Sequence, residues 1–177
     1  MLLQKAFQRH WPRLINLWPP FLGAGIRVTR IAPGWREVDV EMKLRRWNRN
    51  YVGTHYGGSL YSMTDPFFML MLIENLGRDY IVWDKSAGIR FRKPGTGVVR
   101  ASFRLSGEQI QEIRDALQTA EKIDRMFAVE VKDEAGTVIA EVQKQIHVRR
   151  KSAPASRSSD QNAGSVLTGA THSSATS

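Results

Sequence analysis

The sequence predicts an α+β fold in which an antiparallel sheet packs its apolar face against helices. Three observations lead to this prediction. Several segments alternate apolar and polar residues, which is typical of half-buried antiparallel strands. Turn signals such as Pro33-Gly34 and Pro94-Gly95 separate neighbouring segments. One central segment is apolar almost throughout and has no clear polar stripe, so we expect a helix there to be buried on nearly all sides.

Strands are expected wherever the alternation is clean. They are residues 26–31, 36–44, 80–92, 98–105, about 127–131, and 138–148. In the third of these, the alternation predicts one apolar face made of Ile81, Trp83, Ala87, Ile89 and Phe91. Asp84 and Ser86 then fall on the opposite face. In the last strand, the predicted inward face is made of Val138, Ala140, Val142, Ile146 and Val148.

Two further helical segments flank the central one. Ser106 and Gln109 form a capping-box pattern at the start of a polar helix over about residues 107–120. Residues 1–18 carry apolar residues near helical spacing, but Pro12 interrupts the pattern and Pro19-Pro20 is expected to stop it. We therefore expect two short helical turns packed on the domain.

Composition divides the chain into three parts. Residues 1–21 form an N-terminal helical segment, and residues 22–150 form the single domain. Residues 151–177 are rich in Ser, Ala, Thr and Gly and hold almost no large apolar residues. Such a segment cannot offset its ordering entropy by burial, so we expect a disordered low-complexity tail.

Charge and composition narrow the classes of function. The 177 residues contain no cysteine, which fits a cytoplasmic protein and excludes thiolate chemistry. The four histidines are scattered, so we expect no metal site. No apolar run is long enough to span a bilayer, so we expect no stable membrane insertion. The formal charge of +9 permits anionic ligands. No nucleic-acid motif accompanies it, so we expect no nucleic-acid partner.

The candidate site lies in residues 50–76, which read NYVGTHYGGSLYSMTDPFFMLMLIENL. A Gly57-Gly58 pair at the start of an apolar helix would present free backbone N–H groups, which stabilise a carboxylate, a phosphate or a developing oxyanion. Asp65 would follow about two turns later, inside the apolar helix. Another interpretation makes Asp65 the N-cap of a helix over residues 66–76 that Gly77 ends, and leaves the glycine pair as a turn. Local signals alone favour this capping interpretation slightly.

The spacing of Asn50, Gly53, Gly57, Gly58 and Asp65 resembles that of the hotdog-fold acyl-CoA thioesterases of the phenylacetate-pathway type. The wider chain, from about residue 22 to 150, looks closest to a domain family of unknown function within the hotdog superfamily. The resemblance implies a hotdog fold, in which the antiparallel sheet wraps around one long apolar helix, with a second, polar helix between later strands. The sequence departs from the motif at one position, where Tyr56 replaces the usual histidine.

The resemblance also implies roles for individual residues. Asp65 would be the general base or nucleophile, the Gly57 N–H would polarise the thioester carbonyl, and Asn50 would orient water or substrate. The substrate-binding residues carried over in the same way are His55, Tyr56, Gly58, Ser59, Asp84 and Ser86. The implied assembly is a homodimer or a dimer of dimers, with sites between subunits.

Asp84 admits two interpretations. It lies where related enzymes often carry a serine or threonine, and a second acid there would raise the pKa of Asp65 by like-charge repulsion. It is also expected to pair with Lys85, Arg90 or Arg92. We favour the paired interpretation.

The resulting hypothesis is hydrolysis of an acyl-CoA or other thioester without a cofactor. The alternative is a non-catalytic hotdog protein that binds an acyl chain or acyl-CoA through the same apolar groove. A hotdog hydratase is disfavoured, because such enzymes usually place a histidine with the Asp on the site helix, whereas His55 is in the loop.

Overall fold

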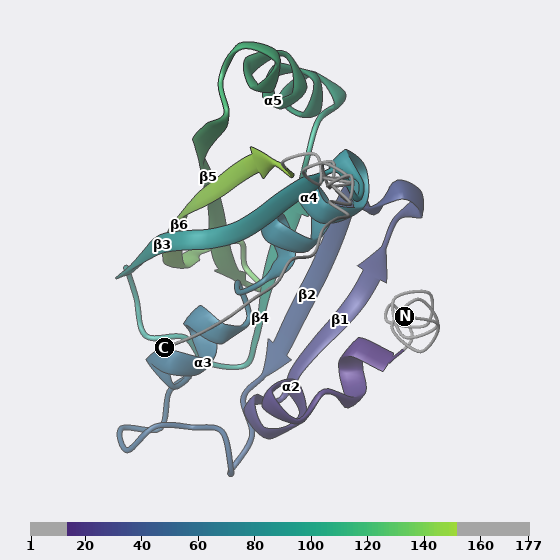
Figure 1. The fold of residues 1–177 in the computed structure, drawn as a ribbon. Coiled ribbons are helices and arrows are strands. Elements are labelled where there is room, and N and C mark those ends of the chain that lie inside the picture. Colours follow the sequence, from purple (N-terminus) through teal and green to yellow (C-terminus); the bar gives the residue numbers. More distant parts are fainter. Residues whose placement is uncertain (1–13, 152–177) are drawn as a thin grey trace, which may run out of the picture.

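The computed structural model describes residues 14–151, and its centre is a six-stranded antiparallel sheet (Figure 1). The strands lie in the order β1-β2-β4-β5-β6-β3. Their bounds are β1 (Ile26–Ile31), β2 (Glu37–Lys43), β3 (Tyr80–Phe91), β4 (Val98–Arg104), β5 (Lys122–Asp133) and β6 (Val138–Arg150). All six predicted strands are present, with β5 beginning earlier than expected.

The sheet is unevenly paired. β6 pairs with β5 on one side and with β3 on the other along most of its length. β4 pairs with β2 along all of β2, but with β5 only over the three residues Val99 to Ala101. The sheet therefore consists of a β1-β2-β4 half and a β5-β6-β3 half that meet at a short seam.

The helices connect and cover the strands. Their bounds are η1 (Ile15–Leu17), α2 (Pro19–Ala24), η2 (Pro33–Trp35), α3 (Gly57–Ser62), α4 (Phe67–Leu76) and α5 (Gly107–Thr119). The helical turn η1 ends at Leu17, directly before Trp18 and the Pro19-Pro20 pair, and these prolines then begin the separate helix α2. The first helical positions need no N–H partner and suit the fixed φ of proline. Most of the predicted N-terminal helix and the predicted tail lie outside the described residues.

The helix α5 begins as its sequence predicts. The Ser106 side chain accepts a hydrogen bond from the Gln109 backbone N–H, and the Gln109 side chain accepts one from the Ser106 N–H. Ile110, Ile113 and Leu117 form its buried stripe. In Figure 1 this helix stands at one end of the molecule, between β4 and β5 in the chain.

The apolar segment forms two helices rather than one, with a break at residues 63–66. Pro66 has no N–H to donate within a helix and disfavours helical geometry at Asp65, so α3 ends at Ser62 and α4 begins at Phe67. The peptide bond between Asp65 and Pro66 is cis. The capping interpretation is also wrong, because the Asp65 side chain makes no cap bond and Gly57 starts a helix of its own.

The core lies between α4 and the inner face of the sheet. Phe67 packs on Phe103 of β4 with ring centroids 4.9 Å apart. Phe68 contacts both Phe103 at 5.2 Å and Phe127 of β5 at 4.8 Å. A sheet that packs in this way around an apolar helix is the hotdog arrangement, and the predicted fold class is confirmed.

A β-bulge in β3 changes which of its residues face the core. The register with β6 shifts between Asp84 and Ser86, so Lys85 is an extra residue. Because of this shift, Asp84 shares the inner face with Ile89, whereas Trp83 lies on the outer face. The prediction of one continuous apolar face along β3 is therefore wrong for the residues before the bulge.

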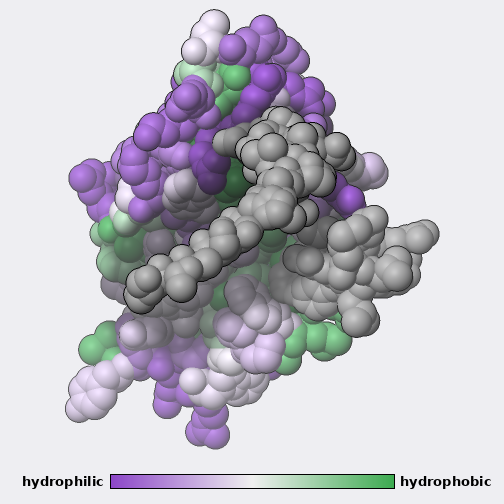
Figure 2. All heavy atoms as spheres, in the orientation of Figure 1, coloured by the Kyte–Doolittle hydropathy of each residue, from purple (hydrophilic) through white to green (hydrophobic). Residues whose placement is uncertain are grey.

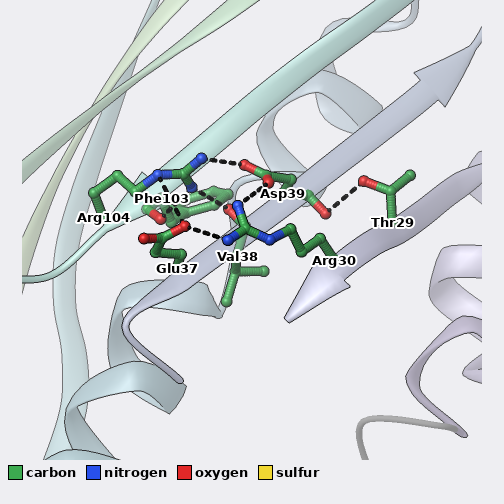
Figure 3. Close-up of polar contacts among 7 residues, drawn as sticks. All are labelled: Thr29, Arg30, Glu37, Val38, Asp39, Phe103 and Arg104. Atoms are coloured by element: carbon green, nitrogen blue, oxygen red, sulfur yellow. Dashed lines mark hydrogen bonds and ion pairs between the residues drawn. The ribbon is translucent and has the colours of Figure 1, made fainter. Parts of the chain in front are cut away.

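The outer face of the other half carries an ion-pair network (Figure 3). Arg104 donates to the Asp39 carboxylate at 2.7 Å, and Arg30 pairs with Glu37 at 2.8 Å. Burial alone would raise the pKa of Asp39, but hydrogen bonds from Arg104 and Ser102 outweigh it and the net direction is down. These residues tie β1, β2 and β4 together across the outer surface.

Hydrophilic residues cover most of the visible surface around α5, and a hydrophobic patch lies near α2 (Figure 2). Several large apolar side chains are exposed in the loop between β2 and α3, and they are Trp47, Tyr51, Val52 and Tyr56. Within residues 14–151, every helix is too short or too polar to cross a membrane.

Phe103→Ala is expected to lower the free energy of unfolding by about 3–5 kcal/mol, because it empties a fully buried site shared by two aromatic contacts. Urea denaturation measures this change. Met126→Ala is the matched control, since Met126 is 62% exposed, and it should change stability by less than about 1 kcal/mol. Equal effects of the two substitutions would contradict the assigned core.

Candidate functional site

The loop before α3 is organised by the side chain of Asn50. Its Oδ1 accepts hydrogen bonds from the N–H groups of Val52 (3.1 Å) and Thr54 (3.0 Å). Its Nδ2 donates to Thr54 Oγ1 at 2.8 Å and to the His55 carbonyl at 3.3 Å. Gly53 adopts φ 86°, which glycine tolerates best. All four hydrogen-bonding positions of the amide are used within the loop. The geometry therefore gives Asn50 a loop-holding role rather than a free group for orienting water.

His55 joins this loop to the turn between β3 and β4. Its backbone N–H donates to the Gly95 carbonyl at 2.9 Å, and its Nε2 lies 3.2 Å from the Gly97 carbonyl. The residue is only 3% exposed, and its Nδ1 has no partner among the described residues. Burial lowers the pKa of His55, and the bond to Gly97 opposes this shift only in part. His55 is thus a buried, neutral histidine that holds the loop in place.

The start of α3 brings two glycines under aromatic rings. A Cβ at Gly57 would lie 2.9 Å from Cζ of Phe91, and one at Gly58 would lie 2.4 Å from Cε1 of Tyr56. Tyr56 is the N-cap residue and makes no side-chain cap bond. Within the described chain, no acceptor is found for the backbone N–H groups of Gly57 and Gly58. These donors are therefore free to bind an external oxygen.

A cavity of about 670 Å³ opens beside this helix start. Its lining comes from the Asn50 loop, α3 and the end of β3, and it is made of Asn50, Val52, Thr54, His55, Gly57, Leu60, Phe91, Arg92, Lys93, Pro94 and Gly95. The cavity combines apolar side chains with two cationic ones. Asp65 is not among the lining residues, so within a single chain its carboxylate does not reach this cavity.

Asp65 belongs instead to a charged cluster with Lys144 and Asp84. The Lys144 Nζ lies 2.5 Å from Oδ1 of Asp65 and 3.0 Å from Oδ2 of Asp84. The Lys144 side chain is 1% exposed, whereas those of Asp65 and Asp84 are 45% and 23% exposed. The cluster is therefore a buried ammonium between two carboxylates, of which Asp65 is the more accessible.

Burial and the neighbouring charges together shift the pKa values of Asp84 and Lys144. Burial raises the pKa of Asp84, Lys144 opposes the rise, and the nearby charge of Asp65 adds to it. Burial alone would lower the pKa of Lys144, but hydrogen bonds to Asp65 and Asp84 outweigh this effect and the net direction is up. Lys144 consequently stays protonated at neutral pH. The expectation that Asp84 pairs with Lys85, Arg90 or Arg92 is corrected, because its partner is Lys144.

The two predicted serines lie in different places. Ser59 is buried within α3, near the glycine pair. Ser86 is on the outer face of β3, where its Oγ donates to Oε1 of Gln145 at 2.8 Å. The structure therefore brings Asn50, His55 and Gly57 together around the cavity, and Asp65 and Asp84 together around Lys144, while Ser86 points away from both groups.

Lys144 is the residue of this cluster that the sequence analysis missed. It lies between Val142 and Ile146 on the inward face of β6, so the alternation itself places a lysine in the core. A charged residue at an inward position of a central strand is the signal that would have found it. Among residues 14–151 no group of His, Cys, Asp and Glu is arranged to hold a metal ion.

Comparison with known proteins identifies the family of the chain. Residues 7–148 match a family model described as a domain of unknown function, DUF4442. The match covers well over half of the chain, so the protein belongs to this family. A search of the curated proteins finds none that matches.

Solved structures with the same fold include several thioesterases. A protein of unknown function from Pseudomonas aeruginosa, PA5026, described as a probable thioesterase, shares 24% identity at a TM-score of 0.68, over 83% of this chain and 96% of that one. The thioesterase HI1161 from Haemophilus influenzae shares 11% identity at a TM-score of 0.57, over 77% of this chain and 86% of that one. The Escherichia coli PaaI protein, from the phenylacetic acid degradation operon, shares 14% identity at a TM-score of 0.56, over 81% of this chain and 92% of that one. These similarities establish the hotdog fold.

Asn50→Ala is expected to lower the free energy of unfolding by about 1–3 kcal/mol, because it leaves the polar groups of the loop unpaired. Urea denaturation is again the measurement. Thr54→Val removes only one of these partners and should have the smaller effect. Unchanged stability of Asn50→Ala would remove the loop-holding role.

The free energy of unfolding should decrease as the pH is lowered below 6.5, the ordinary pKa of histidine. At such pH the His55 side chain binds a proton in the unfolded chain but not in the folded one. This one group contributes a slope of at most about 1.4 kcal/mol per pH unit. His55→Gln should lose that part of the slope. Denaturation of both proteins between about pH 5 and pH 7 measures the difference. Identical slopes would show that His55 titrates alike in the folded and unfolded chains.

Proposed function

We propose that the protein is a thioester hydrolase that acts on acyl-CoA or a closely similar acyl thioester. The observation that carries this proposal is the Asp65 carboxylate. Its side chain is 45% exposed, yet the buried ammonium of Lys144 fixes one of its oxygens. A carboxylate that is both accessible and fixed in position suits a general base or a nucleophile. The thioesterases among the structural neighbours support the same class of reaction.

The cavity beside α3 supports the choice of substrate. Val52, Leu60 and Phe91 give it an apolar wall that suits an acyl or aryl group. Arg92 and Lys93 line the same cavity and suit the phosphates of a CoA thioester. The N–H of Gly57, which lines this cavity and has no acceptor within the described chain, would donate to the thioester carbonyl oxygen. Losing such an oxyanion donor typically costs about 3–4 kcal/mol of barrier.

A second copy of the chain completes the proposed site. Asp65 does not line the cavity of its own subunit, and the resemblance to the phenylacetate-pathway enzymes implies a site between subunits. We therefore propose a homodimer, or a dimer of such dimers, in which one subunit supplies Gly57 and the other supplies Asp65. The exposed apolar residues of the loop between β2 and α3 provide surface for such an interface.

The proposed reaction needs only water and these groups. A water oxygen bonds to the thioester carbonyl carbon as Asp65 takes one proton from that water, and Gly57 stabilises the oxyanion. The C–S bond then breaks, the carboxylic acid leaves, and the thiolate recovers the proton from Asp65. The proposed compartment is the cytoplasm, since a chain without cysteine fits a reducing environment.

Thiol release from a panel of short-chain, long-chain and aryl acyl-CoAs tests this proposal. The native protein is expected to hydrolyse at least one class, and Asp65→Asn should lose at least about a hundredfold in kcat/KM, because it removes the proton acceptor. Asp79→Asn is the matched control, since Asp79 is an exposed carboxylate outside the cluster, and it should retain native activity.

Two further outcomes decide between the alternatives. If no substrate turns over but calorimetry shows that acyl-CoA binds, the protein is a non-catalytic acyl-CoA-binding hotdog and the hydrolase proposal is wrong. If turnover is found, Asp65→Asn and Gly57→Val subunits should regain activity when refolded together, because one mixed site then holds both native groups. Failure to regain activity would place the site within one subunit.

A further inference from the structure

The most unusual side chain in the described core is Lys144. It is fully buried on the inner face of β6, opposite Ala87 of β3, among apolar residues. A buried ammonium is costly unless it is paired and hydrogen-bonded. Both requirements are met by carboxylates from two different parts of the chain. The Lys144 Nζ lies 2.5 Å from Oδ1 of Asp65 and 3.0 Å from Oδ2 of Asp84. The sheet itself does not require a charge at this position.

We propose that Lys144 is a positioning residue for the Asp65 carboxylate, and that Asp84 anchors Lys144 in turn. The inference rests on the proposed function, because it assigns Lys144 and Asp84 to the same reaction. It adds two residues that do not touch the substrate in that proposal and act through Asp65. Asp65 is the most exposed member of the cluster.

The chain positions each member of the cluster by a different device. Pro66 disfavours helical geometry at Asp65, which places this carboxylate in the break between α3 and α4. The bulge at Lys85 shifts the alternation of β3 by one residue. Asp84 therefore lies on the inner face, together with the apolar residues that follow the bulge. The alternation of β6 then carries Lys144 to the point where the two carboxylates meet.

The aromatic ring of Tyr61 completes the surroundings of the ammonium. The Lys144 Nζ lies 5.5 Å from the centre of this ring, within the range of a cation–π contact. The charged or titratable groups that face Lys144 are thus Asp65 from the helix break, Asp84 from β3 and Tyr61 from α3. The Oδ1 atom of Asp84 is buried without a partner among residues 14–151, so this carboxylate depends on Lys144 for its compensation.

The balance of charge gives Lys144 its proposed effect. Two carboxylates that share one site cannot both stay ionised easily, because each repels the charge of the other. The ammonium between them removes this conflict and leaves a net charge of one negative unit. The hydrogen bond from Lys144 also holds the Asp65 carboxylate in one fixed orientation. Without Lys144, the pair would take up a proton at higher pH and the activity would fall with it.

Lys144→Met and Asp84→Asn test this inference together, because they should shift the same titration in opposite directions. Carbon-13 NMR of the aspartate carboxyls follows the first protonation of the pair without any need for turnover. Lys144→Met should raise the pH of this protonation by about 1–3 units, since it removes the opposite charge. Asp84→Asn should lower the pH of the first carboxyl protonation, since it removes the carboxyl whose pKa burial raises. The acid limb of the kcat/KM profile should move in the same directions.

Controls separate this role from a merely structural one. Lys132→Met removes an exposed lysine of β5 that pairs with Glu130, and it should leave the titration unchanged. Lys144→Arg retains the positive charge and should restore the native acid limb, even if its larger head group lowers stability. If Lys144→Met does not fold, Asp84→Asn and Lys144→Arg still decide the matter through the direction of the shift.

The result that overturns the inference is a titration that stays the same in Lys144→Met, or that moves in one direction in both variants. Loss of activity in both variants without any change in the pH profile would likewise make the cluster structural only. A native protein that hydrolyses no thioester would refute the proposed function. The carboxyl titration would still show, in that case, whether Lys144 controls the ionisation of the pair.

Discussion

The register of β6 is the constraint on which the rest of the structure depends. This strand pairs with β5 on one side and with β3 on the other, so its alternation decides which side chains meet α4. Val142 and Ile146 fill the inner face as any core strand would. Lys144 lies between them, and the same alternation carries its charge inside. A shift of one residue would move the apolar set outward and release the ammonium to water.

Burying that ammonium imposes conditions on distant parts of the chain. An isolated charge in the core costs several kcal/mol, and breaking a buried pair costs about 3–5 kcal/mol. The break between α3 and α4 and the bulge in β3 each supply one of the two carboxylates that prevent this. Both are local irregularities that would weaken an isolated helix or strand. Both irregularities are explained by the same requirement, which is that a carboxylate must reach the buried Lys144 ammonium.

The sequence predicted the regular elements well, because they arise from local patterns. Alternation located the strands, the Ser106–Gln109 pair located the start of α5, and Gly77 located the end of α4. The fold class followed from these elements and from the spacing of Gly57 and Asp65. The irregular elements were harder to predict, because each depends on a tertiary partner.

The candidate site shows the same division. Asn50 and Gly53 were recognised as a motif, but the hydrogen bonds that make Asn50 a loop-holding residue appear only when the loop is folded. Asp84 was assigned to the wrong cations, because a bulge changes the face of a strand and has no reliable sequence signal. Lys144 was visible in the alternation, yet a single lysine in a strand is usually exposed.

Because β4 and β5 pair only over a short seam, packing on α4 helps to hold the two halves of the sheet together. Backbone hydrogen bonds hold the two halves together over only three residues of β4, so most of the edge between them is not closed by a ladder. Phe68 touches Phe103 on one side of the seam and Phe127 on the other. The side chains of α4 therefore connect the two halves of the sheet where backbone hydrogen bonds do not. Amide hydrogen exchange would be expected to divide this domain into two cooperative units, with the boundary running beneath α4.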